Sequence, residues 1–85
     1  MYSLICRVMI RLKNGDKIVI TGKSSNKDRN VNVLDKLKKN LAKDASGVLE
    51  DTLYYTIRVT KNTAKDNWKC STLEEVYQIL DEVFD

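Results

Sequence analysis

The residues that most often carry out catalysis are missing from this sequence. It contains no histidine, which excludes Ser-His-Asp and Cys-His nucleophiles and the zinc sites that depend on imidazole. Its two cysteines, Cys6 and Cys70, lack the spacing of a metal site, and two thiolates alone do not complete a structural zinc site. We therefore expect two reduced, buried thiols, no cofactor and no bound metal, and we predict that the protein is not an enzyme.

Two short segments approach known ligand-binding loops but lack their diagnostic residues. Gly22–Ser24 gives the Gly-Lys-Ser of a phosphate-binding loop, but the first glycine of that motif would fall on Lys17. Asp28–Asn32 matches the opening of a calcium loop, but the required glycine is Val33 and the closing glutamate is Lys39. We interpret the first segment as a loop that ends a strand and the second as turn-forming residues with a helix cap.

Carboxylates are concentrated on one face of the helix predicted at the C-terminal end of the sequence. They could supply paired acids and bases or hold magnesium, but no apolar pocket is predicted to shift the pKa of one of them. The carboxylates near the C-terminus of this helix oppose its dipole, which costs about 0.3 to 1 kcal/mol of stability for each exposed group. One candidate binding surface is therefore the acidic face of this helix, which consists of Glu74, Glu75, Asp81, Glu82 and Asp85.

Four interpretations of the acidic face stay open at this point. It could bind a basic partner, mimic the backbone of a nucleic acid, or pair with the lysines of the first predicted helix, Lys36, Lys39 and Lys43. The fourth interpretation is a solvated face that keeps the protein in solution.

Alternation of apolar and polar residues predicts the strands that would position these groups. In the first strand, Leu4, Cys6, Val8 and Ile10 fall on one side and polar residues fall mostly on the other. The predicted strands cover residues 2–13, 17–21, 52–60 and 67–70.

The loop of the first hairpin decides which side chains share a face. A three-residue loop with Gly15 in the left-handed conformation places Ile18 opposite Ile10 and Ile20 opposite Val8. A two-residue turn would place both isoleucines opposite residues of the other face. We predict the three-residue loop because it keeps the apolar side chains together.

Two segments with helical spacing complete the secondary structure. The first is predicted at residues 32–46, with Asn32 as N-cap and Gly47 as its stop. The second follows Ser71 or Thr72, either of which could form a capping box with a glutamate three residues later. Its apolar stripe comprises Leu73, Val76, Tyr77, Leu80, Val83 and Phe84.

The order of elements is ββαββα, which predicts a single α+β domain over residues 1–85. Short connections favour a four-stranded antiparallel sheet of order 2-1-3-4, with both helices packed on one face. Residues 1–47 and 51–85 have similar patterns. A duplicated ββα unit explains this similarity, and so do the common packing rules that both halves obey.

The sheet face opposite the helices is the best candidate site in the sequence. Arginine, tyrosine and methionine among aliphatic side chains are typical of interface cores. An ordinary solvated sheet face is the alternative, although several apolar groups together are unusual there. The candidate partner-binding residues are Ile5, Arg7, Met9, Arg11, Tyr54 and Arg58.

Three functional hypotheses follow, and the first is a non-catalytic protein-binding module such as an adaptor or inhibitor, or a homodimer formed through the open sheet. Lysine outnumbers arginine 11 to 4, which suggests an AT-rich genome such as that of a phage or mobile element. A small phage protein that acts on a host enzyme would belong to this class.

The second hypothesis is nucleic-acid binding by the same face, with arginines on phosphates and Tyr54 stacked on a base. Against it stand a pI of about 8.9, which is only mildly basic, and the acidic second helix, which would repel a polyanion. The third is mimicry of nucleic acid by that helix.

Charge and hydropathy add two expectations. Residues 1–43 contain 11 basic and 3 acidic side chains, whereas residues 44–85 contain 4 basic and 9 acidic ones. No apolar run approaches the length of a membrane span or of a signal-peptide core. We therefore expect a cytoplasmic protein that does not enter the membrane.

Overall fold

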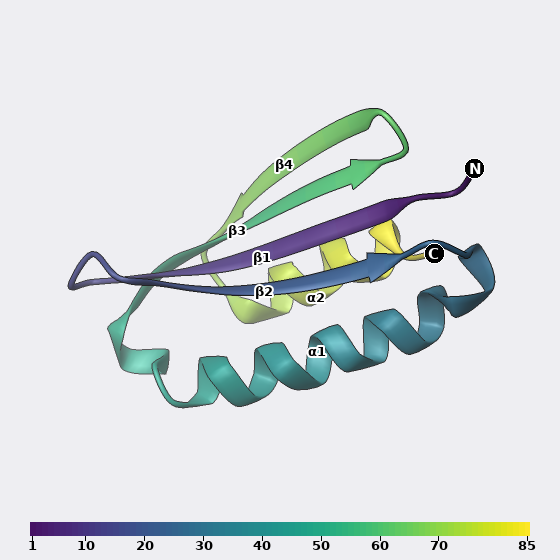
Figure 1. The fold of residues 1–85 in the computed structure, drawn as a ribbon. Helices are drawn as coiled ribbons and strands as arrows, with labels where there is room; N and C mark the ends of the chain where they lie inside the picture. Colours follow the sequence, from purple (N-terminus) through teal and green to yellow (C-terminus); the bar gives the residue numbers. More distant parts are fainter.

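The computed structural model describes all residues, 1–85, as one antiparallel sheet with two α-helices (Figure 1). The elements are β1 (Leu4–Leu12), β2 (Lys17–Ser24), a 3-10 helix (Lys27–Arg29), α1 (Asn30–Ser46), a second 3-10 helix (Leu49–Asp51), β3 (Thr52–Lys61), β4 (Ala64–Cys70) and α2 (Leu73–Val83). The strands lie in the order β2-β1-β3-β4, so the two longest are central. The predicted α+β fold and strand order are confirmed, while the duplication of a ββα unit stays a hypothesis.

The β1–β2 hairpin has the predicted three-residue loop. Gly15 adopts the left-handed conformation, with φ of 92°, and its N–H donates to the carbonyl of Leu12 at 3.0 Å. Ile18 therefore pairs with Ile10, and Ile20 pairs with Val8. This register places the apolar side chains of both strands on one face.

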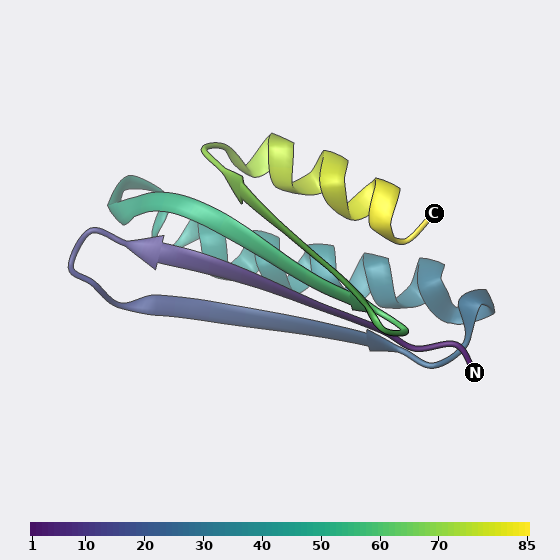
Figure 2. The same cartoon turned by 90° about the horizontal axis from the view of Figure 1, so that it is seen from above.

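Both helices cover that same face of the sheet (Figures 1 and 2). Helix α1 packs against β2, and α2 packs against β3 and β4. Thr72 begins α2 as predicted: its hydroxyl accepts a hydrogen bond from the Glu75 N–H at 3.3 Å. The core between sheet and helices consists of Leu4, Cys6, Val8, Ile10, Ile20, Leu37, Leu41, Ala45, Tyr55, Ile57, Val59, Cys70, Val76, Leu80 and Phe84.

Gly22 of β2 lies beneath α1. A β-carbon at this position would lie 3.3 Å from Leu37 Cδ2 and 3.4 Å from Val33 Cγ1. A side chain there would require these α1 residues to shift by a few tenths of an ångström. The Gly-Lys-Ser segment that approximates a phosphate-binding loop is therefore the end of β2, with its glycine beneath α1.

The start of α1 differs from the prediction. A 3-10 turn capped by Asn26 precedes the helix, and α1 begins at Asn30 instead of after Asn32. Asn32 lies exposed in the first helical turn and caps nothing. The prediction was wrong because Asn30 is held inward by its side chain, so the helical backbone begins two residues earlier.

The outer strands and one core position also differ. Strand β2 continues to Ser24, and β4 begins at Ala64 because a two-residue turn, with Asn62 at φ of 56°, replaces the longer predicted turn. Asparagine tolerates this left-handed conformation better than most residues. Alternation along residues 52–60 predicts that Leu53 faces the core with Tyr55, but Leu53 is 54% exposed because it lies beside the register shift between β1 and β3.

A buried polar network fixes the start of α1 to the N-terminal segment. The Asn30 side chain accepts a hydrogen bond from Ser24 Oγ at 2.7 Å and donates one from Nδ2 to the Tyr2 hydroxyl at 2.8 Å. Asn30 and Ser24 are both buried, so their polar side-chain atoms need partners within the protein. Ser24 Oγ also contacts the Asn26 carbonyl, at 2.8 Å.

Asn30→Ala is predicted to lower the free energy of unfolding by about 1 to 3 kcal/mol, because it leaves buried polar groups unsatisfied. Asn32→Ala, two residues away on the same helix, is the matched control and should change it by less than about 0.5 kcal/mol. Urea denaturation followed by circular dichroism measures both values. A larger loss for the Asn32 variant would mean that the helix begins where the sequence pattern placed it.

Candidate binding face of the sheet

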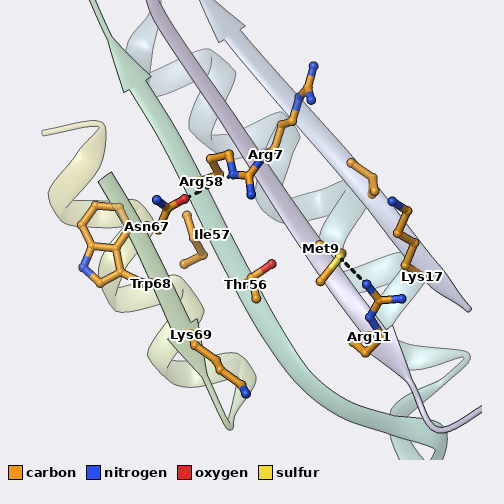
Figure 3. A pocket seen from close by; sticks show the side chains of 11 residues that line it. Arg7, Met9, Arg11, Lys17, Thr56, Ile57, Arg58, Asn67, Trp68 and Lys69 are labelled. Carbon is orange, nitrogen blue, oxygen red and sulfur yellow. Dashed lines mark hydrogen bonds between the residues drawn. The ribbon is translucent and has the colours of Figure 1, made fainter. Parts of the chain in front are cut away.

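Alternate side chains of all four strands point to the face of the sheet that no helix covers, called the open face below (Figure 3). All six residues proposed from the sequence lie on it. A concavity of about 610 Å³ lies over its central part. Across β2, β1, β3 and β4, the rows of the open face are Lys23, Ile5, Thr60, Lys65; then Thr21, Arg7, Arg58, Asn67; then Val19, Met9, Thr56, Lys69; and finally Lys17, Arg11, Tyr54.

The charges of the open face are all positive. Three arginines stand on the central strands and four lysines on the edge strands, and no row contains an aspartate or a glutamate. Lysines on edge strands protect a sheet from pairing with other chains, a role that the arginines of the central strands do not share. The seven basic residues are Arg7, Arg11, Arg58, Lys17, Lys23, Lys65 and Lys69.

Like charges face each other directly across the strands. Arg7 pairs with Arg58 between β1 and β3, and Arg11 pairs with Lys17 between β1 and β2. Opposite charges at such positions stabilise a sheet, and like charges destabilise it, by up to about 1 kcal/mol per pair. No carboxylate offsets this cost, because the single ion pair in the structure joins Lys38 to Asp81 on the helix side.

Neutral groups hold two of the three arginines. Arg11 donates from Nη1 to the Gly15 carbonyl at 3.0 Å and from Nη2 to Met9 Sδ at 3.7 Å. Arg58 Nε donates to Asn67 Oδ1 at 3.2 Å. Arg7 makes no side-chain hydrogen bond and extends toward β2 in Figure 3. The three guanidinium groups therefore keep free donors that an anionic ligand could accept.

Tyr54 gives this basic surface a flat aromatic group. Its ring is half-buried on β3, and Lys69 Nζ lies 4.2 Å from the ring centroid, a cation–π contact. Apolar side chains lie in the neighbouring rows: Ile5 and Met9 are half-buried, and Val19 is 49% exposed. The open face thus combines positive charge with aromatic and aliphatic surface.

The acidic face of α2 lies on the other side of the molecule. Its five carboxylates are exposed, and α2 turns its buried Val76 and Leu80 toward the sheet. Asp81 pairs with Lys38 of α1, a lysine outside the set predicted to meet this face. Helix α2 lies on the covered side of the sheet (Figures 1 and 2), so the sheet separates it from a ligand on the open face.

Alternation along each strand predicted which residues face outward, but the charges of neighbouring strands were not summed over the whole face. The predicted outer strands, residues 17–21 and 67–70, stopped short of Lys23 and Lys65, which the observed β2 and β4 include. Adding the alternate positions of each strand in register would have shown that no acidic residue shares their face.

Both thiols are buried in the core and form no disulfide. Burial raises the pKa of the Cys6 thiol from 9.0 to about 12. Burial also raises the pKa of Cys70, and the nearby Glu75 carboxylate adds to that increase. A thiol that stays protonated at neutral pH is a poor nucleophile, so these groups act as small apolar side chains.

Comparison with known proteins identifies no relative: the chain matches no family model, no curated protein and no solved structure. No helix of the fold has the length and apolar character that crossing a membrane requires. The Cys, Asp and Glu side chains form no group of three or more that could hold a metal ion.

Stability should fall at alkaline pH because of Cys6. Above pH 9 the thiol ionises in the unfolded chain and stays protonated in the folded one, so deprotonation favours unfolding. Between pH 8 and pH 10 this contributes a loss of about 1.4 kcal/mol. Urea denaturation under reducing conditions should show that Cys6→Ala loses less stability over this range than the original protein. Equal losses would mean that the thiol is not shielded from water.

Proposed function

We propose that this protein is a non-catalytic binding module whose open face binds nucleic acid. One observation carries the proposal: seven basic side chains share the face with no acidic one, and two directly opposed pairs of them carry like charge. The basic side chains of this surface repel one another in the free protein, and a ligand with several consecutive negative charges would relieve that repulsion. A nucleic-acid backbone does this.

The sequence raised two objections to nucleic-acid binding, and both weaken when the charged groups are located in the structure. The pI of about 8.9 averages over the whole molecule, whereas the open face carries seven basic side chains and no acidic one. The carboxylates of α2 lie on the covered side of the sheet (Figure 1), and at physiological salt charges beyond a Debye length of about 8 Å are largely screened. A polyanion on the open face therefore meets mainly the arginines and lysines.

An acidic protein partner is the second candidate for the same face. Ile5, Met9 and Val19 support it, since arginine, methionine and tyrosine are enriched in protein interfaces. An adaptor or an inhibitor of a host enzyme, encoded by a phage or a mobile element, would belong to this candidate. Under either proposal we place the protein in the cytoplasm, where two unpaired thiols stay reduced.

Neutralising the open face should abolish most of the binding. We predict that the triple variant Arg7→Thr, Lys17→Thr, Arg58→Thr binds fluorescent oligo-dT at least 10-fold more weakly than the original protein in low salt. The slope of log affinity against log salt should also decrease by about 2, because three phosphate contacts are lost. Threonine suits exposed strand positions, so the sheet should be retained.

The matched control removes the same charge from the other side of the molecule. Lys36→Gln, Lys39→Gln, Lys43→Gln changes three exposed lysines of α1 and should weaken binding by less than 3-fold. Equal losses in the two triple variants would show that net charge, and not the open face, drives binding. No binding of oligo-dT or duplex DNA at low salt would remove the proposal and leave the protein partner.

A further inference from the structure

The composition of the open face restricts which nucleic acid fits it. A duplex presents phosphates and sugars to a broad surface and keeps the flat faces of its bases stacked inside. Proteins that read a duplex usually place a helix or a two-stranded ribbon in a groove, and here both helices lie on the other side of the sheet. Against a duplex, Tyr54, Met9 and Ile5 would meet a charged backbone. Unpaired bases can instead stack on or cover these side chains.

Arg7 and Arg58 form the natural site for one phosphate. They are directly opposite each other on the two central strands, and no acidic group lies on their face. In the structure Arg7 extends toward β2, and Arg58 Nε donates to Asn67 Oδ1 on β4 (Figure 3). A phosphate between them would accept from both guanidinium groups and convert their repulsion into two favourable contacts.

Tyr54 forms the natural site for a base. It stands four residues before Arg58 on β3, a separation of about 13 Å at the rise of a strand. Arg11, its cross-strand neighbour, is held by the Gly15 carbonyl and Met9 Sδ, so the space beside the ring has a fixed wall. Lys69 covers the ring with a flexible, exposed side chain that can move to a phosphate when a base arrives.

We infer that the open face binds single-stranded nucleic acid, with one phosphate held between Arg7 and Arg58 and a base stacked on Tyr54. The strand follows β3 between these two points. This inference rests on the proposed function and specifies its ligand. Arg11 acts as a positioning residue for the base, and the edge lysines contribute to affinity without selecting a sequence.

The first experiment distinguishes the contribution of unpaired bases to the affinity from the contribution of negative charge. Fluorescence anisotropy compares oligo-dT and oligo-U with a duplex of the same length and with heparin, a polyanion that has no bases. Single strands should bind at least 5-fold more tightly than the duplex. Tyr54→Leu should weaken oligo-dT binding at least 5-fold and leave heparin binding unchanged, while Tyr54→Phe should keep the original affinity for both.

The second experiment tests whether the two arginines share a phosphate. Arg7→Thr and Arg58→Thr are measured singly and together with oligo-dT. A shared phosphate predicts that the double variant loses little more affinity than either single variant. Circular dichroism and urea denaturation confirm that each variant is folded.

The outcomes distinguish this inference from the function on which it rests. Equal affinity for duplex and single strand, with no effect of Tyr54→Leu, would overturn the inference while nucleic-acid binding stands. Losses that simply add for Arg7 and Arg58 would overturn the shared phosphate. Failure of every nucleic acid and of heparin to bind at low salt would overturn the proposed function itself.

Discussion

The alternation of side chains along β1 couples the core of this protein to its open face. Because successive residues of a strand point to opposite sides, burying Cys6, Val8 and Ile10 beneath the helices forces Arg7 and Met9 to the other side. A slip of one residue would bury the arginine and expose the core. The candidate site is therefore held in place by the same packing that stabilises the fold, and the Gly15 loop sets both.

Two helices cover one face of a four-stranded sheet, and the division of charge follows from that architecture. Basic side chains occupy the uncovered face, and the carboxylates of α2 occupy the outer surface of the helix layer. The repulsion between Arg7 and Arg58 is small compared with the apolar core packed behind them. A fold can tolerate that cost in the free protein when a ligand removes it on binding.

Periodic features could be predicted from the sequence, and features that depend on single side chains could not. The hairpin register follows from where Ile18 and Ile20 must lie, and the strand order follows from the short connections between elements; both were predicted correctly. The start of α1 was missed because it depends on Asn30 bonding Ser24 and Tyr2, contacts between segments whose proximity the local pattern does not reveal. The full charge of the open face was missed for a similar reason. Lys23 joins it only because β2 continues to Ser24, and Lys65 only because the two-residue turn at Asn62 extends β4.

The central claim is that ligands bind the open face, and backbone amide chemical shifts test it most directly. In a ¹⁵N-labelled sample titrated with oligo-dT at low salt, we expect the largest shift changes at Arg7, Met9, Tyr54, Thr56 and Arg58 of β1 and β3. The exposed positions of α2 should change little. Shift changes concentrated on α2, or on the outer lysines of α1 with the central strands unaffected, would contradict the account.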